Sequence, residues 1–259
     1  MTGGTYGDVS VRIDPDHVAA VELHRPPANF FDVALIRSLA EAYEDLDADE
    51  RCRAIVLCAE GRHFCAGADF TGASNAGPTE PGDLYAEAVR LFATATPVVA
   101  AVQGAAIGGG LGVACSADFR VAGPGSRFSA NFSRLGFHHG FGLTVTLPPI
   151  VGQQRAVELL YTGARIDGRH ASDIGLVDRF VTDDDLIRTE AHALAAEIAQ
   201  SAPLAVASIR RTMRGDLAER FRAATRHEQE EQARLQKTKD FAEGIRATAE
   251  HRTANFEGR

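Results

Sequence analysis

Short apolar segments separated by helical ones are the feature that most constrains this chain. Ala54–Cys58 and Pro97–Val102 are continuous apolar runs, typical of buried strands. Between Asp32 and Asp49 the apolar residues recur at helical spacing, and Asp32 is a suitable N-cap. Two β-rich runs, Val9–Ile13 and Val18–Leu23, precede this helix. Because strand, crossover and strand recur at roughly 45-residue intervals, we expect parallel pairing and an α/β fold.

The last third of the chain changes character and is predicted to be mostly helical. The expected helices are Gln153–Leu160, Asp183–Ile198, Pro203–Met213, Leu217–Leu235 and Thr238–His251. The charges of 217–235, Glu228 among them, predict a solvated face. Without a Pro-, Gly- or Ser-rich linker near residue 200, this part should pack on the front. We therefore expect a core of residues 1–200 and a helical region of residues 201–259.

Composition and charge exclude several classes of protein. The net charge is −8, whereas proteins that grip nucleic acid through phosphates usually carry a basic surplus. No apolar run reaches the roughly 18–20 residues of a membrane helix, and no signal peptide is visible, so the expected compartment is the cytoplasm. The four cysteines form no C-x-x-C pair, which predicts single buried thiols.

Three glycine-bearing stretches are candidate sites for chemistry. They are His63–Phe70 and Gly104–Gly112, each after a buried strand, and Gly136–Gly142. Small residues at the end of a strand leave backbone N–H groups open, and a helix beginning at Gly108–Gly110 would add positive potential. Two such turns on neighbouring strands could form an oxyanion hole. Tight strand–helix packing is the alternative explanation, and these residues alone do not decide between them.

Other site motifs fail in detail. Gly110-Leu111-Gly112 lacks the third glycine of a dinucleotide fingerprint, and the chain has no P-loop, no G-x-S-x-G elbow and no H-E-x-x-H. His138 and His139 are adjacent and have no spaced third ligand, so we expect no metal site.

Two of these stretches resemble a known family. FCAGADF at 64–70 and AIGGGLGVACSAD at 106–118 look like the crotonase superfamily, also called the enoyl-CoA hydratase/isomerase family. ELHRPPAN at 22–29, RIDGRHASDIGLV at 165–177 and RTANF at 252–256 support the resemblance. It implies a spiral of ββα turns with a helical C-terminal region that builds homotrimers or hexamers. It also implies a lyase or isomerase of fatty acid metabolism that takes acyl-CoA thioesters, with coenzyme A as part of the substrate and no separate cofactor.

The resemblance also implies roles for particular residues. The N–H groups of Ala68 and Gly109 would hold the thioester oxygen. Arg25 would meet the CoA phosphates, and Phe256, Lys237 or Lys239 could reach CoA from the tail. The remaining expected substrate-binding positions are Ala66, Gly67, Asp69, Phe70, Gly108, Gly112 and Phe132.

The sequence departs from the family at the two catalytic glutamates. Hydratases of this family hold and protonate water with both of them, and the matching positions here are Gly112 and Phe132. A positioned acid or base contributes roughly 10²- to 10⁴-fold. We therefore expect the reaction not to be standard hydration, and we expect a more apolar pocket that accepts a bulky acyl group.

Histidines are the candidates to replace the glutamates. His138 or His139 could act as acid or base near neutral pH, with isomerisation or hydrolysis of a C–C or C–X bond as the reaction. His63 is expected to be structural and Asp69 to fix its loop; Glu80, Asp83 and Glu87 are weaker acidic candidates. Two alternatives stay open: an acyl-CoA-binding pseudoenzyme without turnover, and a CoA-independent hydrolase of C–C bonds, such as those of diketones.

Overall fold

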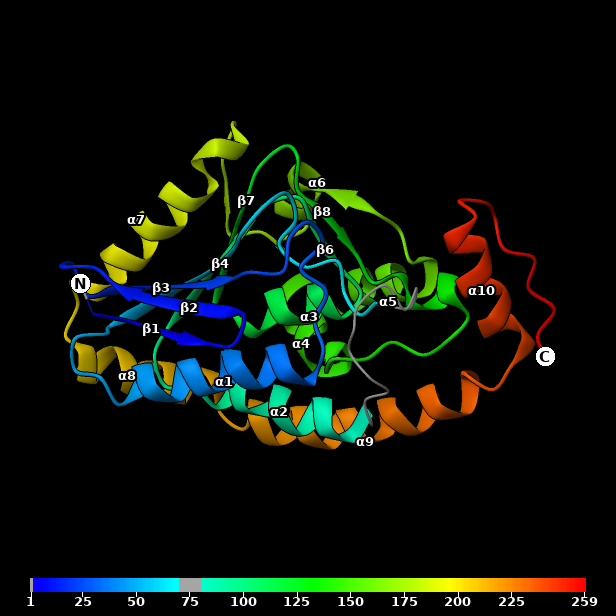
Figure 1. Ribbon diagram of the computed structural model, residues 1–259, viewed down its shortest axis with the longest axis horizontal. Coiled ribbons are helices and arrows are strands. Elements are labelled where there is room, and N and C mark those ends of the chain that lie inside the picture. Colours follow the sequence, from blue (N-terminus) through cyan, green and yellow to red (C-terminus); the bar gives the residue numbers. More distant parts are fainter. Residues whose placement is uncertain (1, 70–80) are drawn as a thin grey trace.

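A twisted seven-stranded sheet forms the centre of the molecule. The computed structural model describes residues 2–69 and 81–259 (Figure 1). The sheet has the order β1-β2-β3-β4-β5-β7-β10. Its strands are β1 (Thr2–Tyr6), β2 (Val9–Ile13), β3 (Val18–Leu23), β4 (Ala54–Ala59), β5 (Val98–Val102), β7 (Phe119–Ala122) and β10 (Arg179–Phe180). β1 to β3 pair antiparallel and β3 to β10 pair parallel, which confirms the expected α/β fold.

A second, three-stranded sheet lies beyond the ends of the parallel strands. It has the order β6-β8-β9, with β6 at Ala105–Ile107, β8 at Arg127–Ser129 and β9 at Ile166–Asp167. β6 follows β5 after a two-residue turn, so the chain passes directly from the large sheet into the small one. Gly104 lies in the turn between the two sheets, and Gly108 to Gly112 follow β6 at the start of α3.

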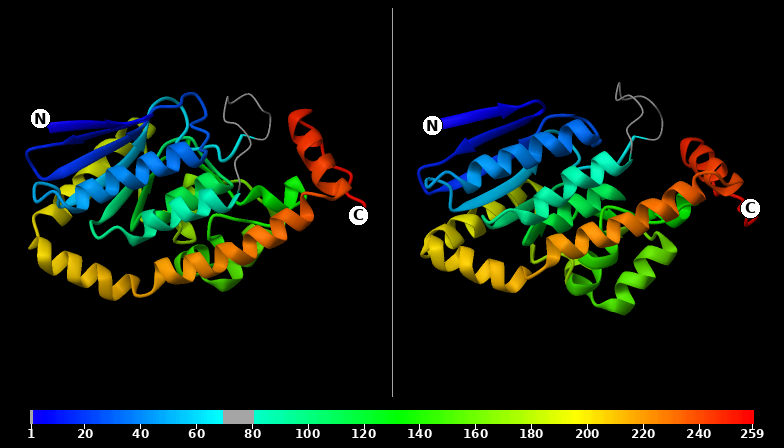
Figure 2. Two further views of the ribbon diagram at one scale, coloured as in Figure 1. Left: turned by 60° about the horizontal axis from the view of Figure 1, so that its bottom comes forward. Right: turned by 90° about the horizontal axis from the view of Figure 1, so that it is seen from below.

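Helices cover the large sheet on both faces (Figures 1 and 2). α1, α2 and α9 lie side by side on one face, and α7 packs on β4, β5 and β7 on the other. The helices are α1 (Val33–Asp47), α2 (Pro81–Ala93), α3 (Gly109–Ser116), α4 (Leu143–Val151), α5 (Gln153–Thr162), α6 (Gly168–Asp173), α7 (Ile187–Ala199), α8 (Pro203–Arg214), α9 (Leu217–Leu235) and α10 (Lys239–Ala249). Short 3-10 turns lie at η1 (Asn131–Leu135) and η2 (Asp184–Leu186).

Local signals in the sequence set several of these boundaries. Asp32 caps α1 by accepting a hydrogen bond from the Leu35 N–H, and Gly163 ends α5 in the left-handed conformation. Pro203 opens α8, where its missing N–H costs nothing. All four cysteines are free and buried, as expected.

The prediction for α9 was wrong at one residue. Glu219, Arg220 and Glu230 are exposed, but Glu228 is fully buried. α9 packs against α2 and α4, and Glu228 lies on that inner face. A count of charges along a helix does not show which face meets a neighbour, so this position could not be separated from the solvated ones.

The structure also contains elements that the sequence did not predict. β1 has the sequence TGGTY, with two glycines and no buried apolar pattern to mark it. α4 contains Pro148 and Pro149, which usually argue against a helix. In the described part of the chain, no helix combines the length and the apolar character that crossing a membrane requires.

Candidate functional site

Two of the glycine-bearing loops lie in contact. Cys65 and Ala106 form a parallel bridge, in which the Cys65 N–H donates to the Ala105 carbonyl at 2.9 Å and the Ile107 N–H donates to the Cys65 carbonyl at 3.1 Å. A Cβ on Gly67 would lie 2.8 Å from the Ile107 carbonyl oxygen and 3.9 Å from the Gly109 nitrogen. Gly67 also has φ +96, so both space and backbone conformation require glycine.

The amides of Ala68 and Gly109 lie at this contact. Ala68 is bridged to Phe31, and the Phe31 N–H donates to the Gly67 carbonyl at 3.0 Å. Gly109 is the first residue of α3, after the expected helix start at Gly108. Neither N–H has a hydrogen-bond partner among the residues that the structure describes. The N-terminal end of α3 adds positive potential beside them.

Asn29 holds the chain that leads into the first of these loops. The sequence analysis did not identify this residue. Its side-chain nitrogen donates to the carbonyls of Glu60 at 2.8 Å and His63 at 2.6 Å, and its oxygen accepts from the Arg25 N–H at 2.8 Å. The residue is fully buried and has φ +49, a conformation that asparagine tolerates better than most residues. Its place in ELHRPPAN, just before the apolar helix, was the available signal.

His63 has a structural contact in the same loop. Its Nδ1 accepts a hydrogen bond from the Ala105 N–H at 3.2 Å. Burial, with help from Arg62 and Arg165, lowers the pKa of His63. His63 therefore links the loop that contains Ala68 to β6.

Arg25 lies between two carboxylates. It contacts Asp8 at 2.6 Å and Asp32 at 2.9 Å. Burial opposes its charge, but the hydrogen bonds that Arg25 donates to Asp32 and Asp8 outweigh this effect and raise the pKa of Arg25. Its charge is thus compensated within the chain.

The acidic candidates lie in different parts of the molecule. Glu87 forms ion pairs with Arg37 and Arg90 between α1 and α2. Phe70, Glu80 and the side chain of Asp83 lie outside the described residues. Asp69 and Ala66 lie in the described part of the first loop, where the Ala66 N–H donates to the Ala28 carbonyl at 2.9 Å.

Aromatic rings fill the space beside α3. A Cβ on Gly112 would lie 2.6 Å from Cβ and Cδ1 of Phe141, and a Cβ on Gly109 would lie 2.4 Å from Cζ of Phe31. The rings of Phe31 and Phe141 pack with centroids 5.2 Å apart. Phe132 lies in η1, with Cζ 3.8 Å from where a Cβ on Gly108 would be. Both positions that the family resemblance assigns to glutamates are therefore closely packed by aromatic side chains.

His138 and His139 come just before this aromatic packing. Their rings stack with centroids 4.1 Å apart, and Nδ1 of His138 donates to the His139 carbonyl at 2.8 Å. Nε2 of His139 lies 2.8 Å from the hydroxyl of Thr144. Burial, with repulsion from His138 and His227, lowers the pKa of His139 to about 4. Its imidazole is therefore neutral at pH 7.

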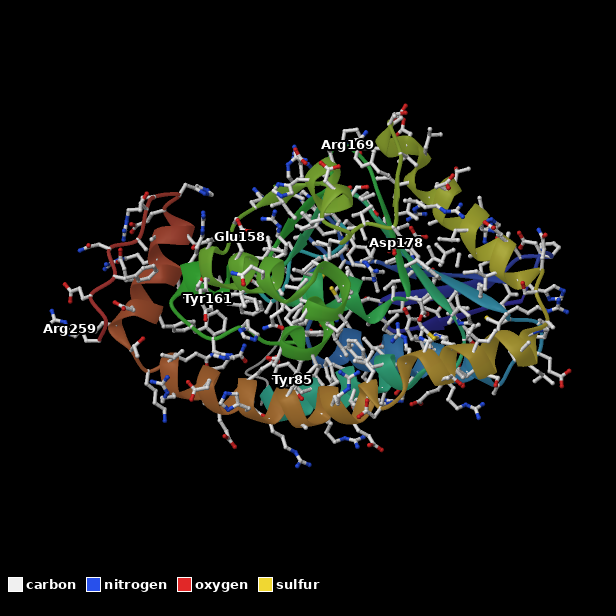
Figure 3. All side chains as sticks on the ribbon, turned by 180° about the vertical axis from the view of Figure 1, so that it is seen from behind. Tyr85, Glu158, Tyr161, Arg169, Asp178 and Arg259 are labelled. Atoms are coloured by element: carbon white, nitrogen blue, oxygen red, sulfur yellow. The ribbon has the colours of Figure 1, made fainter. Side chains whose placement is uncertain are left out.

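The segment that contains the histidines is held by α2 and α9. The Phe141 N–H donates to the Tyr85 hydroxyl at 3.3 Å, and this hydroxyl donates to Gln232 at 3.0 Å. Gln232 in turn donates to the His138 carbonyl at 3.1 Å. Tyr85 lies on α2 where that helix faces α9 (Figure 3). Phe141 itself has φ +57, a strained conformation for an aromatic residue.

Glu228 of α9 completes the arrangement. One carboxylate oxygen accepts from the Gly142 N–H at 2.8 Å, and the other accepts from Thr144, from its N–H at 3.1 Å and its hydroxyl at 2.6 Å. The second oxygen lies 3.8 Å from Nε2 of His139. Burial raises the pKa of Glu228, and the Thr144 and Gly142 donors oppose that rise.

Comparison with known proteins identifies the family. The model of the family described as enoyl-CoA hydratase/isomerase matches residues 14–259. The chain belongs to the enoyl-CoA hydratase/isomerase family. The crotonase fold expected from the motifs, with its ββα spiral and helical C-terminal region, is thereby confirmed.

Individual relatives agree with this family over nearly their whole length. A "Probable enoyl-CoA hydratase" of Bacillus subtilis is 31% identical over 255 residues, covering 96% of this chain and 98% of the relative. One from Mycobacterium tuberculosis is 34% identical over 258 residues, covering 95% and 99%. A crystal structure of an enoyl-CoA hydratase/isomerase from Pseudoalteromonas atlantica superimposes with a TM-score of 0.85 at 29% identity, covering 96% of this chain and all of that one.

Proposed function

We propose that this member of the family acts on an acyl-CoA thioester and stabilises the enolate-like oxygen with the N–H groups of Ala68 and Gly109. The supporting observation is the contact of the two glycine-bearing loops, with Gly67 packed against Ile107 and Gly109. Both N–H groups are without partners among the described residues. In comparable sites, one such donor contributes roughly 2.7–4 kcal/mol to lowering the barrier.

The proposed reaction is not standard hydration of an enoyl thioester. Hydration in this family needs two carboxylates that hold and protonate water, and here Gly112 and Phe132 stand in their places. The packing supports this view, because the Phe141 ring occupies the space that a side chain at position 112 would need. Each absent acid or base removes a contribution of roughly 10²- to 10⁴-fold.

A histidine would instead move the proton, in an isomerisation or in hydrolysis of a C–C or C–X bond. His139 is neutral at pH 7, as a general base must be, and it leads into the segment whose Phe141 packs on α3. The base would take a proton from the α-carbon while the electron pair moves to the thioester oxygen. That oxygen would be held by Ala68 and Gly109.

The acyl group would be bulky or ring-bearing. Phe137 packs against Phe132 and Phe241 with centroid distances of 5.5 Å and 5.2 Å. This buried aromatic cluster lies beside Gly108, at the start of α3. It offers apolar contact and little for a small polar acyl group to bind.

Two other functions remain candidates. The filled glutamate positions favour a pseudoenzyme that binds acyl-CoA without converting it. The two carboxylates around Arg25 favour a C–C bond hydrolase that does not use CoA, because they compensate the cation expected at the CoA phosphates.

The proposed assembly is a homotrimer or a hexamer. Leu204, Ile209 and Met213 on α8 are 86%, 62% and 79% exposed, which is unusual for large apolar side chains and supports an interface. Light scattering of the purified protein would measure the mass, and a monomer would contradict this assembly.

The deciding experiment is incubation with a panel of straight-chain and ring-bearing enoyl- and acyl-CoA thioesters, followed by mass spectrometry. His138→Ala and His139→Ala are run alongside. Turnover that one of them abolishes supports the enzyme. Binding without any product favours the pseudoenzyme, and failure to bind CoA favours the CoA-independent hydrolase. Crotonyl-CoA hydration at roughly 1–10³ s⁻¹ would overturn the proposal that hydration is lost.

A further inference from the structure

Glu228 is a buried carboxylate at the edge of the proposed site, and the expected chemistry gives it no role. It is fully buried, and it approaches Thr144 and His139 from α9. Both of its oxygens accept backbone N–H groups, from Gly142 and Thr144. An ionised carboxylate is a pure acceptor, so this pattern fits the charged form.

The hydroxyl of Thr144 determines which group donates in the hydrogen bonds between Glu228 and His139. A hydroxyl has one hydrogen, and at 2.6 Å from the Glu228 carboxylate it donates there. It must then accept the hydrogen from Nε2 of His139, which lies 2.8 Å away. The proton of a neutral His139 is thus on Nε2, and the lone pair is on Nδ1. Nδ1 has no hydrogen-bond partner in the described part of the chain.

We propose that Glu228 is a positioning residue that acts through Thr144 to keep the proton of His139 on Nε2 and leave Nδ1 as the base. The use of Nδ1 as the base rests on the proposed function, whereas the position of the proton does not. When Nδ1 takes a proton from the substrate, the substrate C–H bond breaks and its electron pair passes to the thioester oxygen. The imidazolium that forms then lies 3.8 Å from the Glu228 carboxylate, which stabilises it.

The other imidazole rings near His139 give the Glu228 carboxylate a role in balancing charge. The His139 ring stacks on His138, which in turn meets His227 edge-on, and when protonated either neighbour would repel a positive charge on His139. Glu228 is the carboxylate within ion-pair distance of His139 among the described residues. It occupies neither of the two positions at which the family carries glutamates.

A purely structural role of Glu228 is the competing explanation. Its carboxylate also caps α4, because Gly142 and Thr144 supply the first free N–H groups of that helix. Thr144→Val separates the two roles. It keeps the shape of the side chain and both N–H contacts to Glu228, and it removes only the hydroxyl between Glu228 and His139.

The first test is the tautomer of His139, measured by ¹⁵N NMR of the imidazole rings in the intact protein. We expect His139 to be protonated on Nε2, and His138 on Nδ1, because Nδ1 of His138 donates to a carbonyl. Signals are assigned by their loss in His139→Gln and His138→Gln. In Thr144→Val, His139 should become a mixture of tautomers while His138 is unchanged. A wild-type His139 protonated on Nδ1 would overturn the proposal.

The second test is steady-state kinetics on whichever thioester the protein converts. We expect Thr144→Val to lower kcat by about 10- to 10⁴-fold with KM changed less than about threefold, and Thr144→Ser to restore kcat. Glu230→Gln, at an exposed glutamate on the same helix, is the matched control and should leave both constants unchanged. An unaltered kcat in Thr144→Val would contradict the role. If the tautomer is as expected but no thioester is converted, the proposed function fails and the assignment of the proton stands.

Discussion

The glycine loops and the histidine segment lie on two sides of α3, and they are built in different ways. The donors of Ala68 and Gly109 are backbone groups, placed by neighbouring strands and small residues. His139 depends on side chains from elsewhere, since Glu228 lies 84 residues from Thr144 in the sequence. Under the proposed function, the site would combine a part specified by a local motif with a part specified by tertiary packing. Each half can be disturbed separately.

The largest effect should come from removing the base on the histidine side. We expect His139→Gln to lower kcat by about 10²- to 10⁴-fold, because the substitution removes the proposed base. His138→Gln should lower kcat less than about tenfold, since His138 donates to a carbonyl and lacks a contact to Glu228. Steady-state kinetics of both variants measures the difference. The reverse order would move the base to His138.

A slightly smaller effect is expected on the glycine side from Gly110→Ala. Its Cβ would lie 2.1 Å from the Cys65 carbonyl oxygen and would push the two loops apart. We expect kcat to fall by about 10²- to 10³-fold, with a loss of about 1–3 kcal/mol in the free energy of unfolding.

Gly152→Ala is the control for this variant. Nothing lies within 4 Å of its Cβ, although its φ of +81 adds strain of about 1–2 kcal/mol. Its kcat should stay at the wild-type level. If Gly110→Ala kept full activity, the contact of the loops would not be needed for catalysis.

The pH dependence of stability tests whether His139 is buried as the structure shows. Its pKa falls from 6.5 to about 4 on folding, so between these values the unfolded chain binds a proton that the folded chain does not. Stability is therefore complete above pH 6.5 and is lost as the pH falls towards 4, by about 2–3 kcal/mol.

Urea denaturation of wild type and His139→Gln between pH 4 and 7.5 measures this loss. The difference between them isolates His139 from Glu228, whose raised pKa contributes in the opposite sense above 4.5. Equal pH profiles would show that His139 is solvated in the folded state.

The smallest effect should come from restoring one of the family's carboxylates. Gly112→Glu places a side chain against Phe141, and we expect a loss of about 1–3 kcal/mol in the free energy of unfolding. Phe141→Ala removes the ring that fills this space. In a chain that already carries Phe141→Ala, Gly112→Glu should therefore cost less stability than it does in the wild-type chain. Thermal denaturation of the three variants closes the cycle. Additive losses would mean that the two positions do not touch.

The sequence predicted the local structure around the glycine loops. Gly108–Gly110 after a buried strand predicted the helix start, and Asp32 predicted the cap of α1. These features depend on a few consecutive residues and on backbone conformation. The parallel pairing of the strands from β3 to β10 also followed from the spacing of apolar runs.

The packed half could not be predicted in the same way. Phe141 covers Gly112 because α2 and α9 hold its segment in a left-handed turn, which no local pattern indicates. Glu228 lies in the same charged helix segment as the exposed Glu230, and it is buried only because α9 packs against α2 and α4. Asn29 is buried for a similar reason, since its partners come from a different loop.

Glu228 follows the glycine loops and Thr144 in the sequence, which sets an order of assembly during synthesis. Chains are made and fold from the N-terminus, and the glycine loops take all their backbone partners from residues up to Ser129. The carboxylate arrives with α9, long after His139 and Thr144. Under the proposed function, a nascent or truncated chain would therefore present the N–H groups of Ala68 and Gly109 before the base is oriented, and the site would be completed only when α9 docks.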